Sequence, residues 1–405
     1  MMPFALEVFF LRCYALILKA AAIILPVPTP LVFAGPGSRL QLCATIASSG
    51  VKNILIVSDA TLNKLGLLDD MQAELAKRGV SYVVYDGIEP DPTVAQIEAG
   101  FAVLQDNNCE AVLAVGGGSP IDGAKVIAAM ATNPKPILKM AGLMKVRKPL
   151  LPLYVVPTTA GTGSEVSVGA VVSDTVNKRK LVLADLTLVP KMACLDGEIY
   201  LGVPPAVTAD TGMDALTHAV ESYLSRNHFE SSDKMALAAV RLIMVNLPRV
   251  YENGKDLEAR QNMALAAHYA GIAMSKAGLG YVHAIAHNFG ALYHVPHGRA
   301  NAMVMPYVLE YSKPACTDRL AELARVSGLG EAGDSEAKLA DRFIAKVREM
   351  NSSFGIPAQL EALQASDIPR ITKAAMSEAR QTYPVPRYMS SATMSRVVRE
   401  IGTTA

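Results

Sequence analysis

The feature that most constrains the fold is a regular alternation of short apolar runs and helix-like segments in the first half of the chain. Each run is as long as a buried strand and ends at turn-forming or polar residues; the clearest runs are 53–57, 81–85, 111–115 and 152–156. Segments with helical spacing lie between them, such as 67–78 and 94–106. This alternation is typical of a doubly wound, mainly parallel sheet, so we expect a Rossmann-like α/β domain.

The composition and periodicity of the sequence change near residue 200. Long stretches rich in alanine, leucine and methionine follow with helical spacing, at 211–224, 231–247 and 257–277, and we find no convincing series of strands. The second half should therefore be all-helical. We expect an apolar N-terminal helix over 1–27, an α/β domain over 28–198 and a helical domain over 199–405.

The N-terminal segment 4–25 is strongly apolar and about long enough to cross a bilayer. However, Glu7, Arg12 and Lys19 interrupt it, and a charge near the middle of a membrane costs several kcal/mol. A signal peptide would carry its basic residues before an unbroken apolar core. We therefore expect an amphipathic helix packed on the protein or on an oligomer partner. Membrane attachment is the alternative.

Composition excludes several classes of partner. The net charge of +1 provides no long-range field for nucleic acid or an anionic membrane. The longest basic run is only Lys178–Lys180, which makes a polyanionic partner improbable. The five cysteines are scattered without a C-x-x-C pair, which argues against disulfides and cysteine metal sites and favours a reducing cytoplasm.

A glycine triplet follows the run 111–115, in the order Gly116, Gly117, Gly118, Ser119 and Pro120. Bare backbone lets N–H groups approach an anion. Ser119 is suited to a helix N-cap, and Pro120 is suited to the first helical position. Asp122 comes three residues after Ser119, where a capping box usually has Glu or Gln. A helix beginning here would point its positive end at a pyrophosphate. A tight turn without a ligand explains the triplet equally well.

A second loop of small residues, 157–165, follows the run 152–156 and contains Thr158, Thr159 and Thr162. Its hydroxyl groups and glycines could line a cofactor. Both loops come directly after predicted strands, at the edge where open α/β sheets bind ligands. Together they indicate a nucleotide crevice.

All seven histidines lie between residues 218 and 297. Asp214 and His218 are four positions apart in a helical stretch, and His283 and His287 repeat that spacing. His297 follows in a predicted turn. A carboxylate and three imidazoles suit Fe²⁺ or Zn²⁺.

Single histidines and single Asp–His pairs have simpler explanations. Such a pair is more often a surface or capping interaction, and a buried histidine usually just forms a hydrogen bond. His228 and His268 are expected to be bystanders, whereas His294 could form a hydrogen bond with one of the metal ligands.

At this point the chain resembles the iron-containing (group III) alcohol dehydrogenases. The resemblance runs from about Pro28 to the C-terminus and rests on four motifs: GGGSPIDGAK (116–125), PTTAGTGSEVS (157–167), GMDALTHAVESYLS (212–225) and GLGYVHAIAHNFGALYHVPHG (278–298). It implies a dehydroquinate-synthase-like fold, in which the α/β domain binds the dinucleotide and the helical domain binds the metal. The segment before Pro26 lies outside the resemblance.

The resemblance also implies roles for individual residues. The implied metal ligands are Asp214, His218, His283 and His297, and His287 is implied to be catalytic, close to the nicotinamide and the substrate. The implied cofactor-binding residues are Asp59, which faces the adenosine ribose and favours NAD over NADP, Gly117, Gly118 and Ser119 at the pyrophosphate, and Thr158, Thr159, Thr162 and Lys180. Asp91 stands where many members have asparagine, which puts its contact in doubt.

These observations predict an enzyme that moves hydride between NAD(H) and a small primary alcohol or aldehyde, with Fe²⁺ or Zn²⁺ as its metal. We also expect a cytoplasmic homo-oligomer without a nucleic-acid partner. One alternative is a polyol or polyol-phosphate dehydrogenase or a dehydroquinate-synthase-like enzyme, but anionic substrates favour clustered basic residues, and only Lys276 and Arg299 lie near the ligands in sequence. The other is a catalytically silent nucleotide-binding or membrane-associated scaffold, against which the complete ligand set argues.

Overall fold

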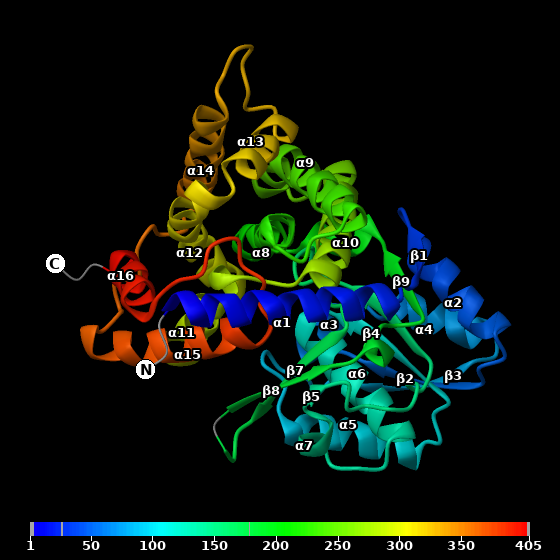
Figure 1. Ribbon diagram of the computed structural model, residues 1–405. Helices are drawn as coiled ribbons and strands as arrows, with labels where there is room; N and C mark the ends of the chain where they lie inside the picture. The colour runs from blue at the N-terminus through cyan, green and yellow to red at the C-terminus, as the bar shows by residue number, and fades with distance from the viewer. Residues whose placement is uncertain (1–3, 26, 178, 403–405) are drawn as a thin grey trace. The chain divides into compact units, whose positions relative to one another are not determined.

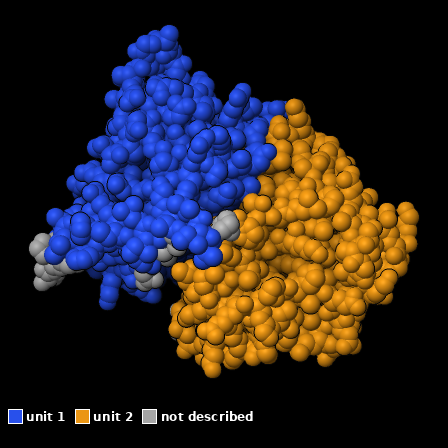
Figure 2. Space-filling model, turned by 45° about the vertical axis from the view of Figure 1, so that its right-hand side comes forward, with its two compact units in different colours: residues 1–26, 204–254, 269–405 blue, residues 27–203, 255–268 orange. Residues whose placement is uncertain are grey.

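The computed structural model of the chain describes residues 4–25, 27–177 and 179–402. The chain forms two compact units (Figure 2). The α/β unit comprises residues 27–203 and 255–268, and the helical unit comprises residues 1–26, 204–254 and 269–405. Residues 255–268, which we expected in the helical domain, group with the α/β unit. The domain boundaries given above remain predictions.

The α/β unit is built on a six-stranded sheet whose neighbouring strands are all parallel (Figure 1). The strand order is β1 (Leu31–Ala34), β9 (Met192–Leu195), β6 (Leu153–Pro157), β4 (Ala111–Gly116), β2 (Asn53–Val57), β3 (Ser81–Tyr85). β2 and β3 have their predicted bounds, β4 is one residue longer, and β6 is displaced by one residue. The predicted mainly parallel sheet is confirmed.

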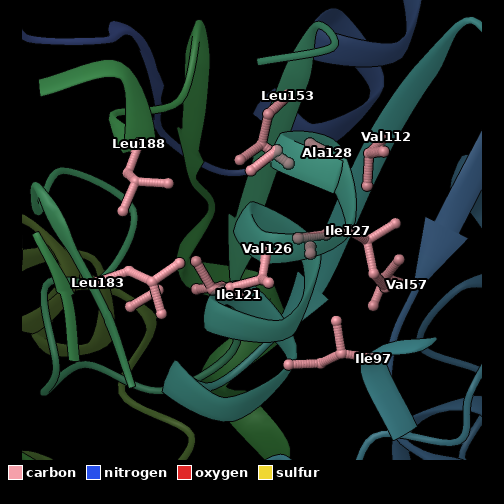
Figure 3. Packing of buried hydrophobic residues seen from close by; sticks show 14 of the residues in the cluster. Val57, Ile97, Val112, Ile121, Val126, Ile127, Ala128, Leu153, Leu183 and Leu188 are labelled. Atoms are coloured by element: carbon pink, nitrogen blue, oxygen red, sulfur yellow. The ribbon is translucent and has the colours of Figure 1, made fainter. Parts of the chain in front are cut away.

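Helices cover both faces of this sheet. On β2, Leu55 and Val57 join one apolar cluster while Ile54 and Ile56 join another. The first cluster includes residues of α5 (Val94–Asp106) and α6 (Gly118–Thr132), as Figure 3 shows. The second includes residues of α2 (Ser38–Ser48) and α4 (Asp69–Lys77). Burial on both faces explains why these strands have continuous apolar sequences.

A smaller sheet in the same unit has the order β5 (Gly142–Leu143), β8 (Arg179–Ala184), β7 (Gly169–Asp174). β7 and β8 pair antiparallel, and the sequence analysis missed this hairpin. Three of the six residues of β8 are exposed and its first two are basic, so it lacks the apolar run that marks the central strands. Two short helices, α3 (Ala60–Lys64) and α7 (Ile137–Met140), complete the unit.

The order of the strands locates a binding edge. From β2 the chain passes to β3 at one side, then crosses to β4 and continues to β6 and β9 at the other side. The direction of winding therefore changes between β2 and β4. Open α/β sheets bind ligands beyond the carboxyl ends of the strands at such a point.

The helical unit has no named strand among its described residues, which confirms the predicted all-helical second half. Its helices are α8 (Pro205–Leu224), α9 (Glu230–Glu252), α11 (Tyr281–Tyr293), α12 (His297–Ser312), α13 (Thr317–Val326), α14 (Glu336–Ser353), α15 (Ile368–Thr382) and α16 (Ser391–Ile401). α10 (Leu257–Ala277) has its predicted bounds, but its first part groups with the α/β unit.

The N-terminal segment forms α1 (Phe4–Ile24), which belongs to the helical unit. Glu7 forms an ion pair with Arg380 at 2.5 Å, and the Lys19 ammonium group lies 5.2 Å from the centre of the Phe229 ring. Within the described part of the chain, no helix is long and apolar enough to span a membrane.

Candidate metal centre

Asp214 and His218 lie one turn apart on α8, so their side chains project from the same face. Pro205 is the first residue of this helix, where its fixed φ is suitable and its missing N–H costs nothing. From Gly212 onward α8 is buried on all sides, and Asp214 and His218 are only 2% and 4% exposed. A carboxylate buried so deeply must be paired or bind a cation.

His283 comes from α11 and His297 from α12. His297 is the first residue of α12, which corrects our expectation of a turn. Pro296 and Gly298 suggested the turn, but Pro296 occupies the N-cap with an extended backbone (φ −52°, ψ 137°) and the helix runs on from His297. The helix start fixes the direction in which the imidazole projects.

Gly298 allows α12 to begin directly against α8. A Cβ atom at this position would overlap the carbonyl group of Asp210 and lie 3.2 Å from Cβ of Asp214. Only glycine permits this approach, which places Nε2 of His297 3.5 Å from Oδ1 of Asp214.

The four side chains converge on one point. Their donor atoms all lie within 4.8 Å of one another. Oδ1 of Asp214 is 3.8 Å from Nε2 of His218 and 3.7 Å from Nε2 of His283. The His218 and His283 rings stack with their centres 4.8 Å apart. Sequence positions from 214 to 297 are thus brought together by three helices.

This arrangement fits a divalent transition-metal ion. Donors bound about 2.1 Å from one ion with tetrahedral geometry lie roughly 3.4 Å apart, close to the separations seen here. Asn301 Nδ2 lies 2.8 Å from Oδ1 of Asp214 and 3.1 and 3.2 Å from Nε2 of His283 and His297. One amide nitrogen has two hydrogens and cannot satisfy three acceptors, so the site has acceptor capacity for a cation.

Electrostatics around Asp214 favour positive charge. Burial alone would raise the pKa of Asp214, but the charges of His218 and His297 and the adjacent His283 ring hold it well below its usual value. Burial would likewise lower the pKa of His283, but the nearby carboxylate of Asp214 and the hydrogen bond to Glu221 raise it to about 9. The two carboxylates therefore stabilise positive charge at the His283 ring, whether a proton or a metal ion carries it.

Glu221 is a supporting residue that the sequence analysis missed. It lies two turns after Asp214 on α8, and its Oε2 is 2.7 Å from Nδ1 of His283. Its two oxygens also accept hydrogen bonds from the backbone N–H groups of Gly280 and Val282, at 2.8 and 2.7 Å. The carboxylate keeps the hydrogen of His283 on Nδ1, so that the Nε2 lone pair faces the centre. Seven-residue spacing from Asp214 was the available signal.

His287 lies beside the candidate ligands, one turn after His283 on α11. Its ring stacks with that of His297 at a centre-to-centre distance of 5.3 Å, and its side chain is 41% exposed. Nδ1 of His287 is 2.7 Å from Glu378 of α15, which also accepts a hydrogen bond from the Tyr383 hydroxyl. Neither partner was predicted, because both lie some 90 residues away in the sequence.

The first cofactor loop lies at the carboxyl end of β4. The predicted capping box is wrong: Gly117 is the N-cap of α6 and Ser119 lies inside its first turn. Ser119 Oγ accepts a hydrogen bond from the backbone N–H of Asp91, at 3.2 Å. Asp122 binds the Ser164 hydroxyl and the Val171 N–H. α6 therefore begins at Gly118, earlier than the predicted start after Ser119. The N–H groups of its first turn have no partner within the helix.

The second cofactor loop lies beside the first. Thr158 donates its backbone N–H to Gly116 at 2.9 Å. A Cβ atom on Gly117 would lie 3.3 Å from Thr159, and one on Gly118 would lie 2.9 Å from Thr162. The absence of Cβ atoms at Gly117 and Gly118 thus leaves room for these threonine side chains.

Asp59 and Lys180 have further contacts in the α/β unit. Asp59 follows β2 and caps α3, where it accepts a hydrogen bond from the Leu62 N–H at 3.0 Å. Lys180 lies on β8 and forms an ion pair with Asp91 at 2.6 Å. Asp91, through its backbone N–H, also touches the first cofactor loop.

The remaining histidines lie apart from the donor cluster. His228 is 2.9 Å from Asp233 and His268 is 3.0 Å from the buried Glu165, which are the hydrogen-bonded environments expected of bystanders. His294 ends α11 in the left-handed conformation (φ 55°).

Family comparison covers nearly the whole chain. Residues 28–197 match the family model described as "Iron-containing alcohol dehydrogenase", and residues 208–402 match "Fe-containing alcohol dehydrogenase family, C-terminal". The chain belongs to the iron-containing alcohol dehydrogenases. α1 precedes both matched ranges.

Individual relatives agree with this family membership. The chain is 34% identical over 367 residues to an NAD-dependent methanol dehydrogenase of Bacillus methanolicus, covering 90% of this chain and 96% of the relative. It is 36% identical over 368 residues to a 1,3-propanediol dehydrogenase of Klebsiella pneumoniae, covering 90% and 93%. A crystal structure of 1,3-propanediol oxidoreductase superposes with a TM-score of 0.89 at 35% identity, covering 92% of this chain and 98% of that one.

Proposed function

We propose that this iron-containing alcohol dehydrogenase transfers hydride between NAD(H) and a small primary alcohol or its aldehyde, with Fe²⁺ or Zn²⁺ held by Asp214, His218, His283 and His297. The observation that carries the proposal is the convergence of one carboxylate and three imidazoles in the helical unit. The relatives support the cofactor and the substrate size, because one is named for NAD and methanol and another for 1,3-propanediol.

The metal, when bound, supplies a Lewis acid that lowers the pKa of an alcohol hydroxyl group. The chain holds and orients this site. Asp214, His218 and His283 are almost fully buried and exclude water from one side. The side chain of His297 is 43% exposed, so substrate can approach from the side of His297 and His287.

His287 is suited to move the proton of the alcohol. Its Nδ1 is held by Glu378, which leaves Nε2 as the exchanging atom. Because the His287 side chain is 41% exposed, a proton taken up there can pass to solvent. The Tyr383 hydroxyl in turn donates to Glu378 and holds its carboxylate beside Nδ1 of His287.

The cofactor supplies the hydride acceptor, and the α/β unit binds it. We assign its pyrophosphate to the free N–H groups of Gly117, Gly118 and Ser119 at the start of α6. Thr158, Thr159, Thr162 and Lys180 border the same loops, and Asp59 follows β2 at the point where the winding of the sheet changes.

Metal analysis combined with turnover tests the metal assignment. Replacing His283 or His297 by alanine should abolish tight metal binding and NAD-dependent alcohol oxidation together. His228→Ala removes a half-exposed histidine outside the cluster and is the matched control. Normal metal content and activity in both ligand variants would remove the assignment.

The coenzyme assignment has its own test. Asp59→Asn retains an oxygen that can cap α3 but removes the charge that repels the 2′-phosphate of NADP. The wild-type enzyme should have a higher kcat/KM with NAD, and the variant should narrow this preference about tenfold. A wild-type preference for NADP would show that Asp59 does not face the ribose.

A phosphorylated or carboxylated substrate is a weaker candidate. Arg299 follows two residues after His297, but its guanidinium group donates to Asp210 at 3.1 Å. Its charge is therefore already compensated.

We also infer a reducing cytoplasmic location and a homo-oligomer. All five cysteines are free thiols, and four of them are buried. Sedimentation of the purified chain tests the oligomeric state.

A further inference from the structure

α1 presents its charged residues and its apolar residues in an unusual arrangement. Glu7 and Lys19 face the helical unit, where they contact Arg380 and the ring of Phe229. An ordinary surface helix buries its apolar face and exposes its charges. In α1, by contrast, Glu7 near the start and Lys19 near the end form the ionic and cation–π contacts with the rest of the helical unit.

Apart from Arg12, most of the exposed described side chains of α1 are large and apolar. Its exposed large side chains are Phe4, Leu6, Phe9, Phe10, Tyr14, Leu16, Ile17, Ile23 and Ile24, with exposed fractions from 41% to 76%. Phe9 and Phe10 pack edge to face with ring centres 5.8 Å apart. Single exposed apolar residues are ordinary, but a group of this size on one helix marks an interaction surface.

A cationic pocket lies beside the first turns of α1. It has a volume of about 370 Å³, and Phe4, Val8 and Arg12 of α1 line one side. Arg226 and Arg387 line the other side, together with Tyr388. No described lining residue is acidic.

The three arginines are available to bind an anion. Among the described residues, none of the three forms an ion pair with a carboxylate. Arg387 is held in place by a hydrogen bond to the Tyr311 carbonyl at 2.8 Å and by stacking on the Tyr311 ring, 4.4 Å from its centre. Arginine presents a planar set of donors that matches phosphate oxygens.

We propose that α1 docks the enzyme on a lipid surface that contains anionic phospholipids. The outer apolar side of the helix lies in the plane of the interface among the acyl chains, and Arg12, Arg226 and Arg387 bind a lipid phosphate group. Apolar side chains and an arginine-lined pocket occur side by side in the structure, as acyl chains and phosphate do in a phospholipid.

Charge complementarity favours lipid over a second copy of the chain. Glu7 is the only acidic residue of α1, and Arg380 already binds it. The apolar side of a second α1 would bring no negative charge to the three arginines. A phospholipid headgroup supplies that charge.

Flotation of the full-length enzyme with vesicles tests the proposal. The enzyme should float with phosphatidylcholine vesicles that contain phosphatidylglycerol, and much less with phosphatidylcholine alone. The double variant Arg12→Gln/Arg226→Gln should weaken binding about thirtyfold, or about fivefold for each charge removed. Phe9→Ser/Phe10→Ser should weaken it by at least about tenfold, since two rings no longer leave water. High salt should release the wild-type enzyme.

Matched variants separate the specific surface from general effects. Leu65→Ser removes another exposed apolar side chain, and Arg241→Gln removes an exposed arginine of α9. Both should float like the wild type, and all variants should retain metal. Equal binding to both vesicle types, or unchanged binding of the two double variants, would overturn the proposal. An enzyme that ignores vesicles but forms a dimer disrupted by Phe9→Ser/Phe10→Ser would show that a second copy covers this surface instead.

Discussion

Glu221 uses two oxygens to contact one imidazole and two backbone N–H groups. It lies on the same helix as Asp214 and His218, and it binds the first turn of the helix that supplies His283. A single buried carboxylate thereby sets both the tautomer of His283 and the position of α11. Such outer contacts affect metal affinity by about 10–100-fold.

Glu221→Gln should therefore lower metal affinity by about one to two orders of magnitude with little change in helix content. An amide must turn its NH₂ group either toward the Val282 N–H or toward the imidazole and the Gly280 N–H, so at least one contact is lost. Competition with a chelator measures the affinity. Glu165→Gln is the matched control, because Glu165 is also buried and bound to a histidine, but in the α/β unit. Equal affinities of the two variants would refute a positioning role.

Contacts between elements depend on a few small residues. α12 begins against α8 only because residue 298 lacks a Cβ atom, and the absence of Cβ atoms at residues 117 and 118 leaves room for the second cofactor loop beside the start of α6. These glycines hold the elements that carry the proposed metal and cofactor residues at the required spacing.

Gly298→Ala should cost about 1–3 kcal/mol of stability, because the new methyl group meets the backbone of α8 rather than a movable side chain. It should also lower metal affinity by moving His297 away from Asp214. Urea denaturation and metal titration measure the two effects. Gly202→Ala is the control, since no atom lies within 4 Å of its added Cβ. Wild-type metal affinity in Gly298→Ala would show that the spacing of α8 and α12 does not limit the site.

α6 is tied to the segment after the second cofactor loop by Lys125. Its ammonium group is fully buried and donates to the carbonyl groups of Ser167 and Gly169 at 2.9 and 2.7 Å. Burial lowers the pKa of Lys125 to about 8, despite the nearby carboxylates of Asp122 and Glu165. The usual pKa of 10.5 applies to the unfolded chain.

This difference predicts a pH-dependent stability. Below about pH 8 both states hold the proton, and no pH dependence arises. Between about pH 8 and 10.5 only the unfolded chain holds it, so the free energy of unfolding rises with pH. The stability of the wild type relative to Lys125→Met should increase by about 2 kcal/mol from pH 7 to pH 9.5 in urea denaturation. Lys64→Met, at an exposed lysine, should show no such trend. A constant difference for Lys125→Met would contradict the burial of a charged amine.

At the scale of the whole molecule, periodicity predicted the elements whose environment is simplest. β2, β3, α5 and α10 have the predicted bounds. β2 is buried and reads as a continuous apolar run, and β3 at the sheet edge still consists mainly of valine and tyrosine, which favour strands. The β7–β8 hairpin was missed because half-exposed strands resemble loops in sequence. The start of α12 was wrongly predicted as a turn because a proline precedes the helix.

The residues of the candidate site likewise fall into those that the sequence indicated and those that only the fold reveals. Spacing within one helix suggested Asp214 with His218, and the family resemblance added the distant members of the set. Glu221 and Glu378 could not be chosen among 37 acidic residues, since only the packing of α8, α11 and α15 brings them to the histidines. The contribution of α1 also depends on the fold, because sequence alone does not show that Glu7 and Lys19 contact the helical unit while Arg12 stays exposed.

The separation of the two proposed binding sites into different units leads to a last prediction. The four proposed metal ligands belong to the helical unit, whereas the proposed pyrophosphate loop belongs to the α/β unit. An ion present at 100 times its Kd stabilises the part of the chain that binds it by about 2.7 kcal/mol. Chelation should therefore speed hydrogen exchange of the α11 and α12 amides, while β2 and β4 amides change little. NADH should protect the amides at the start of α6 in both the metal-loaded and the chelated enzyme.

His283→Ala should remove the response to metal and retain the response to NADH, with His228→Ala behaving as the wild type. Equal changes in both units on chelation would mean that the metal acts on the fold as a whole.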